Sequence, residues 1–247
     1  MITTPQMAAP ELSIVIPAFD EAGNIGRLVD EVLEVLRGRL AFELIVVDDA
    51  STDGTLAELS VRRAGAPELR LLRHARRSGQ STAIRNGVKA ARGAWVVTLD
   101  GDGQNDPADI PRLLAARAAA APRVRLFTGW RVERRDRPSR RLASKLANAL
   151  RRRVLRDDTP DTGCGIKLFE RVAFLDLPYF DHMHRYLPAL MQRAGWGTRS
   201  VPVGHRPRGA GRSKYGNWQR AWAGLADLGG VAWLIRRNHR VDVEEVE

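Results

Sequence analysis

Short apolar runs and amphipathic stretches alternate along the first half of the chain. Three apolar runs have the length and composition of buried strands, Leu12–Pro17, Phe42–Val47 and Leu69–Leu72. Between the first two runs, apolar residues recur at the i, i+3, i+4, i+7 spacing of an amphipathic helix, at Ile25, Leu28, Val29, Val32, Leu33 and Leu36. The pattern therefore predicts strands and helices in turn.

The same alternation continues to about residue 121. Ser81–Arg92 is predicted to be a helix ended by a glycine, and Ala94–Leu99 a strand. Asp106 has the side chain of a helix N-cap and Pro107 the fixed φ of a first helical residue, so a helix is predicted from there to about Ala121. This β-α-β order predicts an α/β fold, with a largely parallel sheet covered by helices on both faces.

The second half of the chain is less regular. His184–Ala194 has the pattern of a helix, Thr198–Val203 that of a strand, and Trp218–Arg236 is the last predicted element. Within it, the 15 residues Ala221–Ile235 carry one charge, Asp227, and are too few to cross a bilayer. This segment either lies in a membrane interface, anchored by tryptophans and arginines, or packs on the protein core.

Composition and charge narrow the class of protein. With 247 residues, 44% of them hydrophobic and 28% charged, the chain is expected to fold around a sizeable core. Its single cysteine, Cys164, excludes an intrachain disulfide and a cysteine-based zinc cluster, and it fits a reducing compartment. The net charge is +11, and Arg131–Arg156 alone holds eleven basic and two acidic residues. Such a block indicates a polyanionic partner: nucleic acid, anionic lipid headgroups or a phosphorylated substrate.

Two aspartates follow the predicted strand Ala94–Leu99. Asp100 and Asp102 are separated by Gly101, and side chains at i and i+2 of an extended segment point the same way. We therefore expect both carboxylates to face one point beyond the carboxyl end of a strand, where open α/β sheets bind ligands. Oxygen ligands suit Mg²⁺ or Mn²⁺, which take further ligands from substrate phosphates. An isolated Asp-x-Asp is more often an acidic turn, so this assignment depends on the rest of the sequence.

Five motifs occur in order over about two hundred residues. They are Ile16–Glu21 (IPAFDE), Val46–Thr55 (VVDDASTDGT), Leu99–Gln104 (LDGDGQ), Asp161–Gly165 (DTGCG) and His205–Gly216 (HRPRGAGRSKYG). Together they make the chain resemble the family-2 glycosyltransferases, and within them the dolichyl- or polyprenyl-phosphate sugar transferases of the dolichol-phosphate mannose synthase type. The resemblance covers about residues 12–216 and implies a GT-A-type nucleotide-sugar-binding domain. Gly101 departs from the family, which commonly has Ala there, and this change is expected to leave metal binding intact.

The resemblance implies which residues bind the donor. It assigns the nucleotide base and ribose to residues after the first two strands, Pro17, Phe19, Glu21, Asp48 and Asp49, and one of the two aspartates should accept hydrogen bonds. It assigns the divalent cation that bridges the nucleotide diphosphate, Mg²⁺ or Mn²⁺, to Asp100, Asp102 and Gln104. Asp53 is instead expected to be structural, because Asp is a good helix cap.

The resemblance also implies how the reaction proceeds. It places Arg131, Arg140 and Ser144 at an acceptor phosphate, and Arg206 and Lys214 in a loop that clamps the diphosphate. The expected catalytic residues are Asp102, Arg140, Arg206 and Lys214. The expected reaction is inverting transfer of a sugar from GDP-mannose or a UDP-hexose to polyprenyl or dolichyl phosphate. A phosphate monoester has a second pKa near ~6, so it is largely an anion at neutral pH and needs cations to hold it, not a dedicated general base.

Several residues are assigned only to a region of the site. His182 and His184 have a spacing that also suits a metal, but their segment is expected to lie near the sugar or the acceptor. Asp161 is expected to orient the sugar or Arg140. Other arginines of the basic block are expected to anchor the chain to anionic headgroups, Arg151, Arg152 and Arg153.

Two other functions fit part of the sequence. A transferase that acts on a sugar hydroxyl needs a carboxylate base, and Asp161 is the best one available. A nucleic-acid-binding protein is indicated only by the basic composition. Arg131–Arg156 contains no aromatic residue on which a base could stack, so nucleic acid is not the expected partner.

The expected organisation is one catalytic domain between two flanking segments. Residues 1–10 are predicted to be a flexible N-terminus without a secretory signal, 11–216 the catalytic domain, and 217–247 an amphipathic interfacial helix with a tail. The chain is expected in the cytoplasm, held peripherally on an anionic membrane surface by its basic block and last helix. The sequence leaves open whether a separate membrane subunit assists it.

Overall fold

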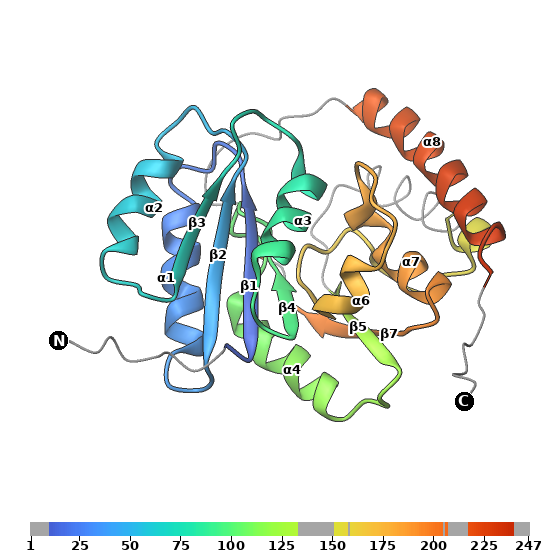
Figure 1. Cartoon of the computed structure of the whole chain (residues 1–247), viewed down its shortest axis with the longest axis horizontal. Helices are drawn as coiled ribbons and strands as arrows, with labels where there is room; N and C mark the ends of the chain where they lie inside the picture. Colours follow the sequence, from blue (N-terminus) through green and yellow to red (C-terminus); the bar gives the residue numbers. More distant parts are fainter. Residues whose placement is uncertain (1–9, 133–150, 158, 205, 207–216, 240–247) are drawn as a thin grey trace, which may run out of the picture.

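The computed structural model describes residues 10–132, 151–157, 159–204, 206 and 217–239, and for residues 217–223 it describes only the helical backbone. Within these residues a seven-stranded sheet forms the centre of the molecule, in the order β3-β2-β1-β4-β6-β5-β7 (Figure 1). Its strands are β1 (Leu12–Ala18), β2 (Phe42–Asp48), β3 (Leu69–Arg73), β4 (Trp95–Thr98), β5 (Val124–Arg131), β6 (Lys167–Glu170) and β7 (Gly197–Val203).

The sheet is mostly parallel. β1 pairs in parallel with β2 and β4, β2 with β3, and β5 with β7. Within the described sheet, β6 alone runs the other way, antiparallel to both β4 and β5. The predicted α/β fold is confirmed, and the reversed strand is an addition that the sequence pattern did not indicate.

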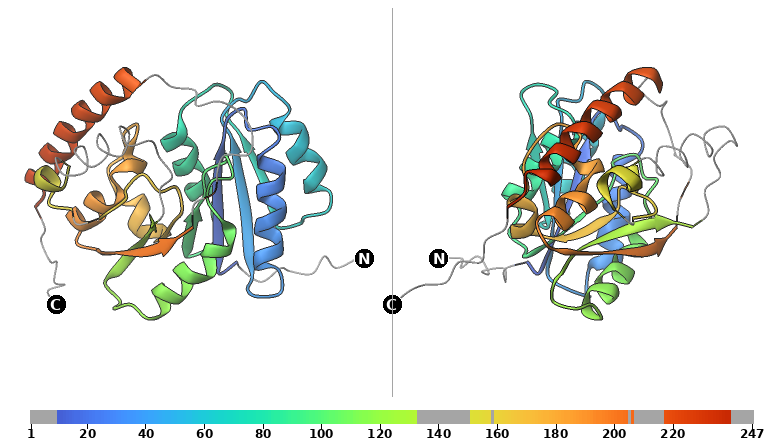
Figure 2. Two further views of the ribbon diagram at one scale, coloured as in Figure 1. Left: turned by 180° about the vertical axis from the view of Figure 1, so that it is seen from behind. Right: turned by 90° about the vertical axis from the view of Figure 1, so that its right-hand side faces the viewer.

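Helices cover both faces of the sheet, as predicted (Figures 1 and 2). The described helices are α1 (Ile25–Leu36), α2 (Thr55–Arg63), α3 (Gln80–Ala90), α4 (Ile110–Ala118), α6 (Arg171–Leu175), α7 (Leu187–Arg193) and α8 (Asn217–Arg236), with short 3₁₀ turns η1 (Pro107–Asp109) and η2 (Met183–Arg185). Helices α1, α2 and α4 contribute to one apolar cluster, and α3, α6, α7 and α8 to the other. The alternation of side chains along a strand divides β1 between them, because Ile14 and Ile16 point into the first cluster and Val15 into the second.

Two predicted helices differ from expectation at their ends. The segment after Asp106 begins as a 3₁₀ turn, with the Asp106 carboxylate accepting the backbone N–H of Ala108 at 2.9 Å, and α4 ends at Ala118 instead of about Ala121. The predicted helix from His184 is split into η2 and α7, with Pro188 near the α7 start. Proline has no backbone N–H to donate, so it is tolerated in the first turn of a helix and not further along.

Helix α8 packs on the outside of α7 by one of its faces (Figure 2). Asp227 accepts from His182 Nδ1 at 3.0 Å, and the Gly224 carbonyl accepts from the Tyr186 hydroxyl at 3.0 Å. On the face of α8 that meets the core, Val231 is fully buried. Leu225 and Trp233 are 50% and 59% exposed. The expectation that this segment packs on the core therefore holds for one face of α8, and contact of the other face with a membrane stays a prediction.

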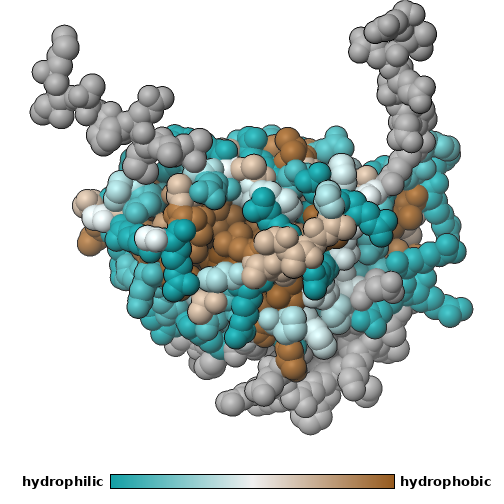
Figure 3. All heavy atoms as spheres, turned by 90° about the horizontal axis from the view of Figure 1, so that it is seen from below, coloured by the Kyte–Doolittle hydropathy of each residue, from teal (hydrophilic) through white to brown (hydrophobic). Residues whose placement is uncertain are grey.

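No helix among the described residues combines the length and apolarity that crossing a bilayer requires. Seen from below, the described surface is mainly hydrophilic, with smaller groups of hydrophobic residues between (Figure 3).

Candidate active site

The sheet edge where β1, β2 and β4 end carries most of the polar residues singled out in the sequence. Asp48 is the last residue of β2, and Asp100 and Asp102 follow β4. Strand β4 ends at Thr98, and Gly101 and Asp102 form a turn. The two aspartates are therefore not the extended i, i+2 pair that we expected from the sequence. Their carboxylates nevertheless interact, and the charge of Asp102 raises the pKa of Asp100.

Asp100 is held from three sides. Its backbone N–H donates to Asn105 Oδ1 at 2.9 Å, and its Oδ1 accepts from Gln80 Nε2 at 2.8 Å. A Cβ atom on Gly165 would overlap Asp100 Oδ2. The Gly165 carbonyl also accepts from the Thr98 hydroxyl at 2.8 Å. The DTGCG motif therefore ends in glycine because the Asp100 carboxylate occupies the space that a side chain would need.

The electrostatics of Asp100 and Asp102 fit a site for a divalent cation. Burial raises the pKa of Asp100 above its ordinary value, Asp102 raises it further, and Lys167 and Arg131 oppose the shift. Asp102 is 8% exposed, and its Oδ1 accepts the backbone N–H of Gln104 at 3.1 Å. In the described part of the chain, no three His, Cys, Asp or Glu residues converge as a metal site would require. Two crowded oxygen ligands thus suit a cation that takes its other ligands from a substrate and water.

The two aspartates after β2 have different surroundings. Asp49 accepts three hydrogen bonds, from His74 Nδ1 at 2.7 Å and from the backbone N–H groups of Ser78 and Gly79, both at 2.8 Å. These bonds fix the segment that leads into α3 and so position Gln80 against Asp100. Asp48 is buried; its Oδ1 accepts from Ser51 N at 3.0 Å and its Oδ2 lies 3.2 Å from Arg73 Nε.

The end of β1 closes against the same edge. The Arg77 guanidinium stacks 4.1 Å from the centre of the Phe19 ring, and Glu21 accepts from Asn24 Nδ2 at 3.2 Å. A Cβ atom on Gly101 would lie 2.9 Å from the Pro17 carbonyl oxygen. Alanine at position 101 would therefore require the backbone to shift, and glycine here is tied to the close approach of the Asp100 loop to β1.

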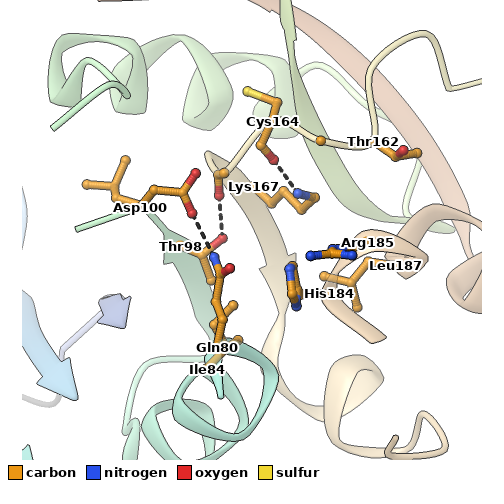
Figure 4. A pocket seen from close by; sticks show the side chains of 13 residues that line it. Gln80, Ile84, Thr98, Asp100, Thr162, Cys164, Lys167, His184, Arg185 and Leu187 are labelled. Atoms are coloured by element: carbon orange, nitrogen blue, oxygen red, sulfur yellow. Dashed lines mark hydrogen bonds between the residues drawn. The ribbon is translucent and has the colours of Figure 1, made fainter. Parts of the chain in front are cut away.

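A cavity of about 360 Å³ lies beside Asp100, within the range of small-ligand sites (Figure 4). Its lining comes from α3, β4, β6, η2, the start of α7 and the loops after β4 and before β6. The lining residues are Gln80, Ile84, Thr98, Leu99, Asp100, Thr162, Gly163, Cys164, Gly165, Lys167, His184, Arg185 and Leu187. Lys167 is buried, and its ammonium group donates to the Cys164 carbonyl (Figure 4). Burial lowers the pKa of Lys167.

His184 lines the cavity as a neutral side chain. Ser81 Oγ accepts the backbone N–H of His184 at 3.3 Å and lies 2.6 Å from its Nδ1. The short contact between Ser81 Oγ and Nδ1 holds the ring in one orientation. Burial, with the charges of Arg185 and Lys167 also contributing, holds the pKa of His184 well below its usual value.

Comparison with known proteins decides the family. The model of the family described as glycosyl transferase family 2 matches residues 13–177, about two thirds of the chain. The chain belongs to this family.

The names of two curated relatives of this family 2 member describe enzymes that act on polyprenyl phosphates. The chain is 35% identical over 236 residues to dodecaprenyl-phosphate galacturonate synthase of Rhizobium johnstonii, covering 93% of the chain and 69% of the relative. It is 33% identical over 208 residues to undecaprenyl-phosphate 4-deoxy-4-formamido-L-arabinose transferase of Pectobacterium carotovorum, covering 83% of the chain and 62% of the relative. The chain thus spans about two thirds of the length of these proteins.

Solved structures share the fold. Glucosyl-3-phosphoglycerate synthase of Mycobacterium tuberculosis with Mn²⁺, UDP and glucosyl-3-phosphoglycerate superposes with a TM-score of 0.63 at 21% identity, over 92% of this chain and 77% of that one. The UDP complex of the same synthase gives a TM-score of 0.68 at 21% identity, over 91% and 80%. At this identity the likeness concerns the fold alone, and it agrees with the predicted GT-A-type domain.

Two arginines that the family resemblance assigned to substrates have partners within the family 2 domain. Asp161 accepts from Arg131 Nε at 2.7 Å and from its Nη2 at 2.9 Å, and both side chains are largely buried. Arg206 lies 2.7 Å from both Glu31 and Asp106. The expectations that Arg131 holds the acceptor phosphate and that Arg206 clamps the diphosphate stay predictions. Each guanidinium already faces a carboxylate of the chain.

The remaining assignments have separate outcomes. Gln104 lies at the Asp102 turn, and its amide is 3.5 Å from the Arg206 carbonyl. Asp53 is structural, as expected, since it accepts from the backbone N–H groups of Ala22 and Thr55. Three expected site residues lie outside the described part of the chain, Arg140, Ser144 and Lys214.

The two histidines of the expected sugar or acceptor segment point to different neighbours. His182 pairs with Asp227 of α8, and His184 with Ser81 of α3. Of this segment, His184 and Arg185 line the cavity. Lys167 and Gln80 were missed by the sequence reasoning. The available signal for Lys167 was a lysine inside a short apolar run. Gln80 had no such signal, because only the fold brings its side chain to Asp100.

Proposed function

We propose that this chain transfers a sugar from a nucleotide-sugar donor to a polyprenyl phosphate, with inversion at the sugar carbon. The observation that carries the proposal is the paired Asp100 and Asp102 beside a cavity that contains Lys167 and Arg185. The names of the curated relatives support the same acceptor class. Those names differ in the sugar, so the proposal leaves the transferred sugar, and the choice between GDP and UDP donors, to experiment.

Asp100 and Asp102, with Gln104 beside them, are proposed to hold Mg²⁺ or Mn²⁺. Bound there with the donor diphosphate, the cation supplies positive charge against the charge that develops on the leaving diphosphate. Gln80 Nε2 fixes one Asp100 oxygen at 2.8 Å, and Gly165 leaves room for the other. These contacts hold the carboxylate in one orientation before any substrate binds, which reduces the reorganisation needed during the reaction.

The donor nucleotide is proposed to bind at the ends of β1 and β2. Pro17, Phe19, Glu21 and Asp48 are the proposed base and ribose contacts. Asp49 is not proposed for this role, because His74, Ser78 and Gly79 already donate to it. Its part is to position the start of α3, and through α3 the Gln80 amide.

The structure favours a phosphate acceptor over a sugar hydroxyl. A hydroxyl needs a base, and Asp161 was the best candidate from the sequence. Both Asp161 oxygens accept from the Arg131 guanidinium in a buried pair. Moving a proton onto Asp161 would break that pair and leave a buried charge uncompensated. A phosphate monoester is already largely anionic and needs no such step.

Arg140, Ser144 and Lys214 remain proposed contacts for the acceptor and the diphosphate. Arg140 and Ser144 belong to the basic block Arg131–Arg156, which supplies the positive charge that a phosphate acceptor requires.

The chain is proposed to work at the cytoplasmic face of a membrane, since a polyprenyl tail stays in the bilayer. The exposed face of α8 offers Leu225 and Trp233, followed by Arg236 and Arg237, as an amphipathic contact, and the basic block is proposed to add electrostatic attraction. In this arrangement residues 11–216 form the catalytic part and 217–247 face the lipid. A separate membrane subunit is the alternative means of attachment.

A transfer assay that compares acceptors tests the proposal. Purified chain with Mn²⁺ and labelled UDP- or GDP-sugars is expected to label undecaprenyl phosphate and to leave undecaprenol and free sugars unlabelled. Labelling of a sugar hydroxyl at an equal or higher rate would instead support the hydroxyl-acceptor alternative.

A further inference from the structure

The cavity beside Asp100 is lined by three side chains of the basic residue types, and they come from two elements. Lys167 comes from β6, and His184 and Arg185 from η2 (Figure 4). They are close enough that both cations lower the pKa of His184. Among the residues that line this cavity, Asp100 is the one acidic side chain, and it accepts the Gln80 amide.

In the described structure, neither of the two cations in the cavity forms an ion pair with an acidic side chain. Lys167 donates to the uncharged carbonyl of Cys164, and the charges of Asp100 and Asp161 act on it without a direct ion pair. Arg185 has no ion pair with any described residue. By contrast, the nearby Arg131 is fully engaged by Asp161. Buried or partly buried cations are normally paired, so an anion is the ligand chemistry that this arrangement lacks.

We propose that this part of the cavity is a subsite for an anionic group of a substrate, with Arg185 as the main ligand and Lys167 and His184 as flanking groups. The inference rests on the proposed function, because the group belongs either to the transferred sugar, as a carboxylate, or to the acceptor, as its phosphate. The planar fork of a guanidinium matches both groups bidentately. His184 adds a neutral imidazole ring to the lining, because its pKa is held well below the usual value.

The protonation of the flanking groups agrees with this assignment. Burial lowers the pKa of Lys167, and a bound anion stabilises its charged form. The Ser81 hydroxyl lies 2.6 Å from His184 Nδ1, so the orientation of the ring beside the proposed anion is fixed.

Matched ligands and the variant Arg185→Gln test the subsite. Titration calorimetry with MnCl₂ compares UDP, UDP-galactose and UDP-galacturonate, and in parallel GDP, GDP-mannose and GDP-mannuronate. Each pair differs in a CH₂OH or a carboxylate at one carbon. The KM for undecaprenyl phosphate is measured on the same proteins. Arg63→Gln, an exposed arginine at the end of α2, is the charge-matched control.

If the anion is on the sugar, the wild-type chain binds the uronate roughly ten- to a hundredfold more tightly than its neutral partner, and Arg185→Gln removes that preference. If the anion is the acceptor phosphate, donor affinities stay unchanged and the KM for undecaprenyl phosphate rises by roughly the same factor. Arg185→Lys, which keeps the charge but not the fork, should fall between in either case. It also serves if Arg185→Gln does not fold.

Three results would overturn the subsite. One is an Arg185→Gln protein whose uronate preference and acceptor KM both stay within about twofold of the Arg63→Gln control. Another is an equal loss of affinity for UDP or GDP alone, which would place the guanidinium on the nucleotide diphosphate. Failure of the wild-type chain to bind any of these nucleotides would contradict the proposed function as well, whereas the first two results leave it standing.

Discussion

At the scale of single residues, the candidate site depends on how closely Gly165 approaches Asp100. The glycine belongs to the loop before β6, and the carboxylate to the loop after β4. A methyl group on Gly165 would meet Asp100 and Asn105 at once. This contact links two motifs that are about sixty residues apart in the sequence and makes them parts of one site.

Gly165→Ala is expected to displace the Asp100 carboxylate. It should weaken Mn²⁺-dependent nucleotide binding by roughly tenfold or more and lower the free energy of unfolding by roughly 1–3 kcal/mol, as overpacking does. Calorimetry and denaturant unfolding measure the two effects. Gly163→Ala is the matched control, because a Cβ there would lie at ordinary distances, 3.4 Å from Arg131 Nη2 and 3.6 Å from Asp161 Oδ1. Equal behaviour of the two variants would remove the role given to Gly165.

Asp100→Asn is expected to stabilise the metal-free protein. The pKa of Asp100 is raised above 3.8 by burial and by Asp102, so the folded state binds a proton more tightly than the unfolded state. The stability this group provides is therefore present at low pH and lost as the pH rises through its folded pKa. Removing the charge should raise the unfolding free energy by about 0.5–2 kcal/mol at neutral pH and by nothing below about pH 3.8.

Thermal melts in EDTA between about pH 3.8 and pH 7 measure the difference in stability between Asp100→Asn and wild type. A variant less stable than wild type at pH 7 would mean that the Asp100 charge is well compensated in the folded state. The buried charge would then not lower the stability of the wild-type protein.

At the scale of elements, the sequence predicted the helices and strands whose hydrophobic pattern reflects burial of one face or of both faces. The bounds of β1, β2 and α1 were predicted to within a residue or so, because nearly every position of the two strands and one whole face of the helix are buried. α2 was missed, because only Thr55 and Leu59 of its nine residues are buried and its apolar spacing is weak. β6 was missed because it has four residues and carries the buried Lys167.

The two faces of α8 are expected to have separable roles. Leu225→Ala with Trp233→Ala should weaken flotation with anionic liposomes while leaving the melting temperature within a degree or two, because both side chains are half exposed or more. Val231→Ala should do the reverse and cost roughly 1–3 kcal/mol of stability, since Val231 is buried against the core. Flotation and thermal melts on the same preparations decide this. Loss of stability in the double variant would show that the exposed face is part of the core.

At the scale of the whole molecule, the candidate site combines residues that the sequence could indicate with others that only packing brings together. Asp100 and Asp102 form a local motif and were predicted. The cavity next to them joins α3, β6 and η2, so the grouping of Lys167 with Arg185 has no signature in the sequence. Arg131 and Asp161 were both predicted to act on substrates. Their pairing depends on β5 lying beside the loop that carries Asp161, which periodicity does not reveal.

The uneven charge of the molecule predicts salt-dependent membrane binding. The basic block Arg131–Arg156 and the arginines after α8 should together attract an anionic surface, at about 1 kcal/mol for each basic residue near it and within a Debye length of about 8 Å at physiological salt. The chain should float with anionic liposomes at low salt, be released at high salt, and ignore neutral ones. If it ignores anionic liposomes at low salt, attachment through a separate membrane subunit becomes the better explanation.

Metal-dependent sugar transfer through Asp100 and Asp102 is best tested by assaying wild type and Asp102→Ala with undecaprenyl phosphate, each with Mn²⁺ and with EDTA. We expect transfer by the wild-type chain only with Mn²⁺ and nearly none by the variant. Circular dichroism and melting of the variant should show an intact fold, because Asp102 lies in a turn beyond the end of β4. Normal turnover by Asp102→Ala with saturating donor, or undiminished transfer by the wild type in EDTA, would contradict the proposed role of the two aspartates.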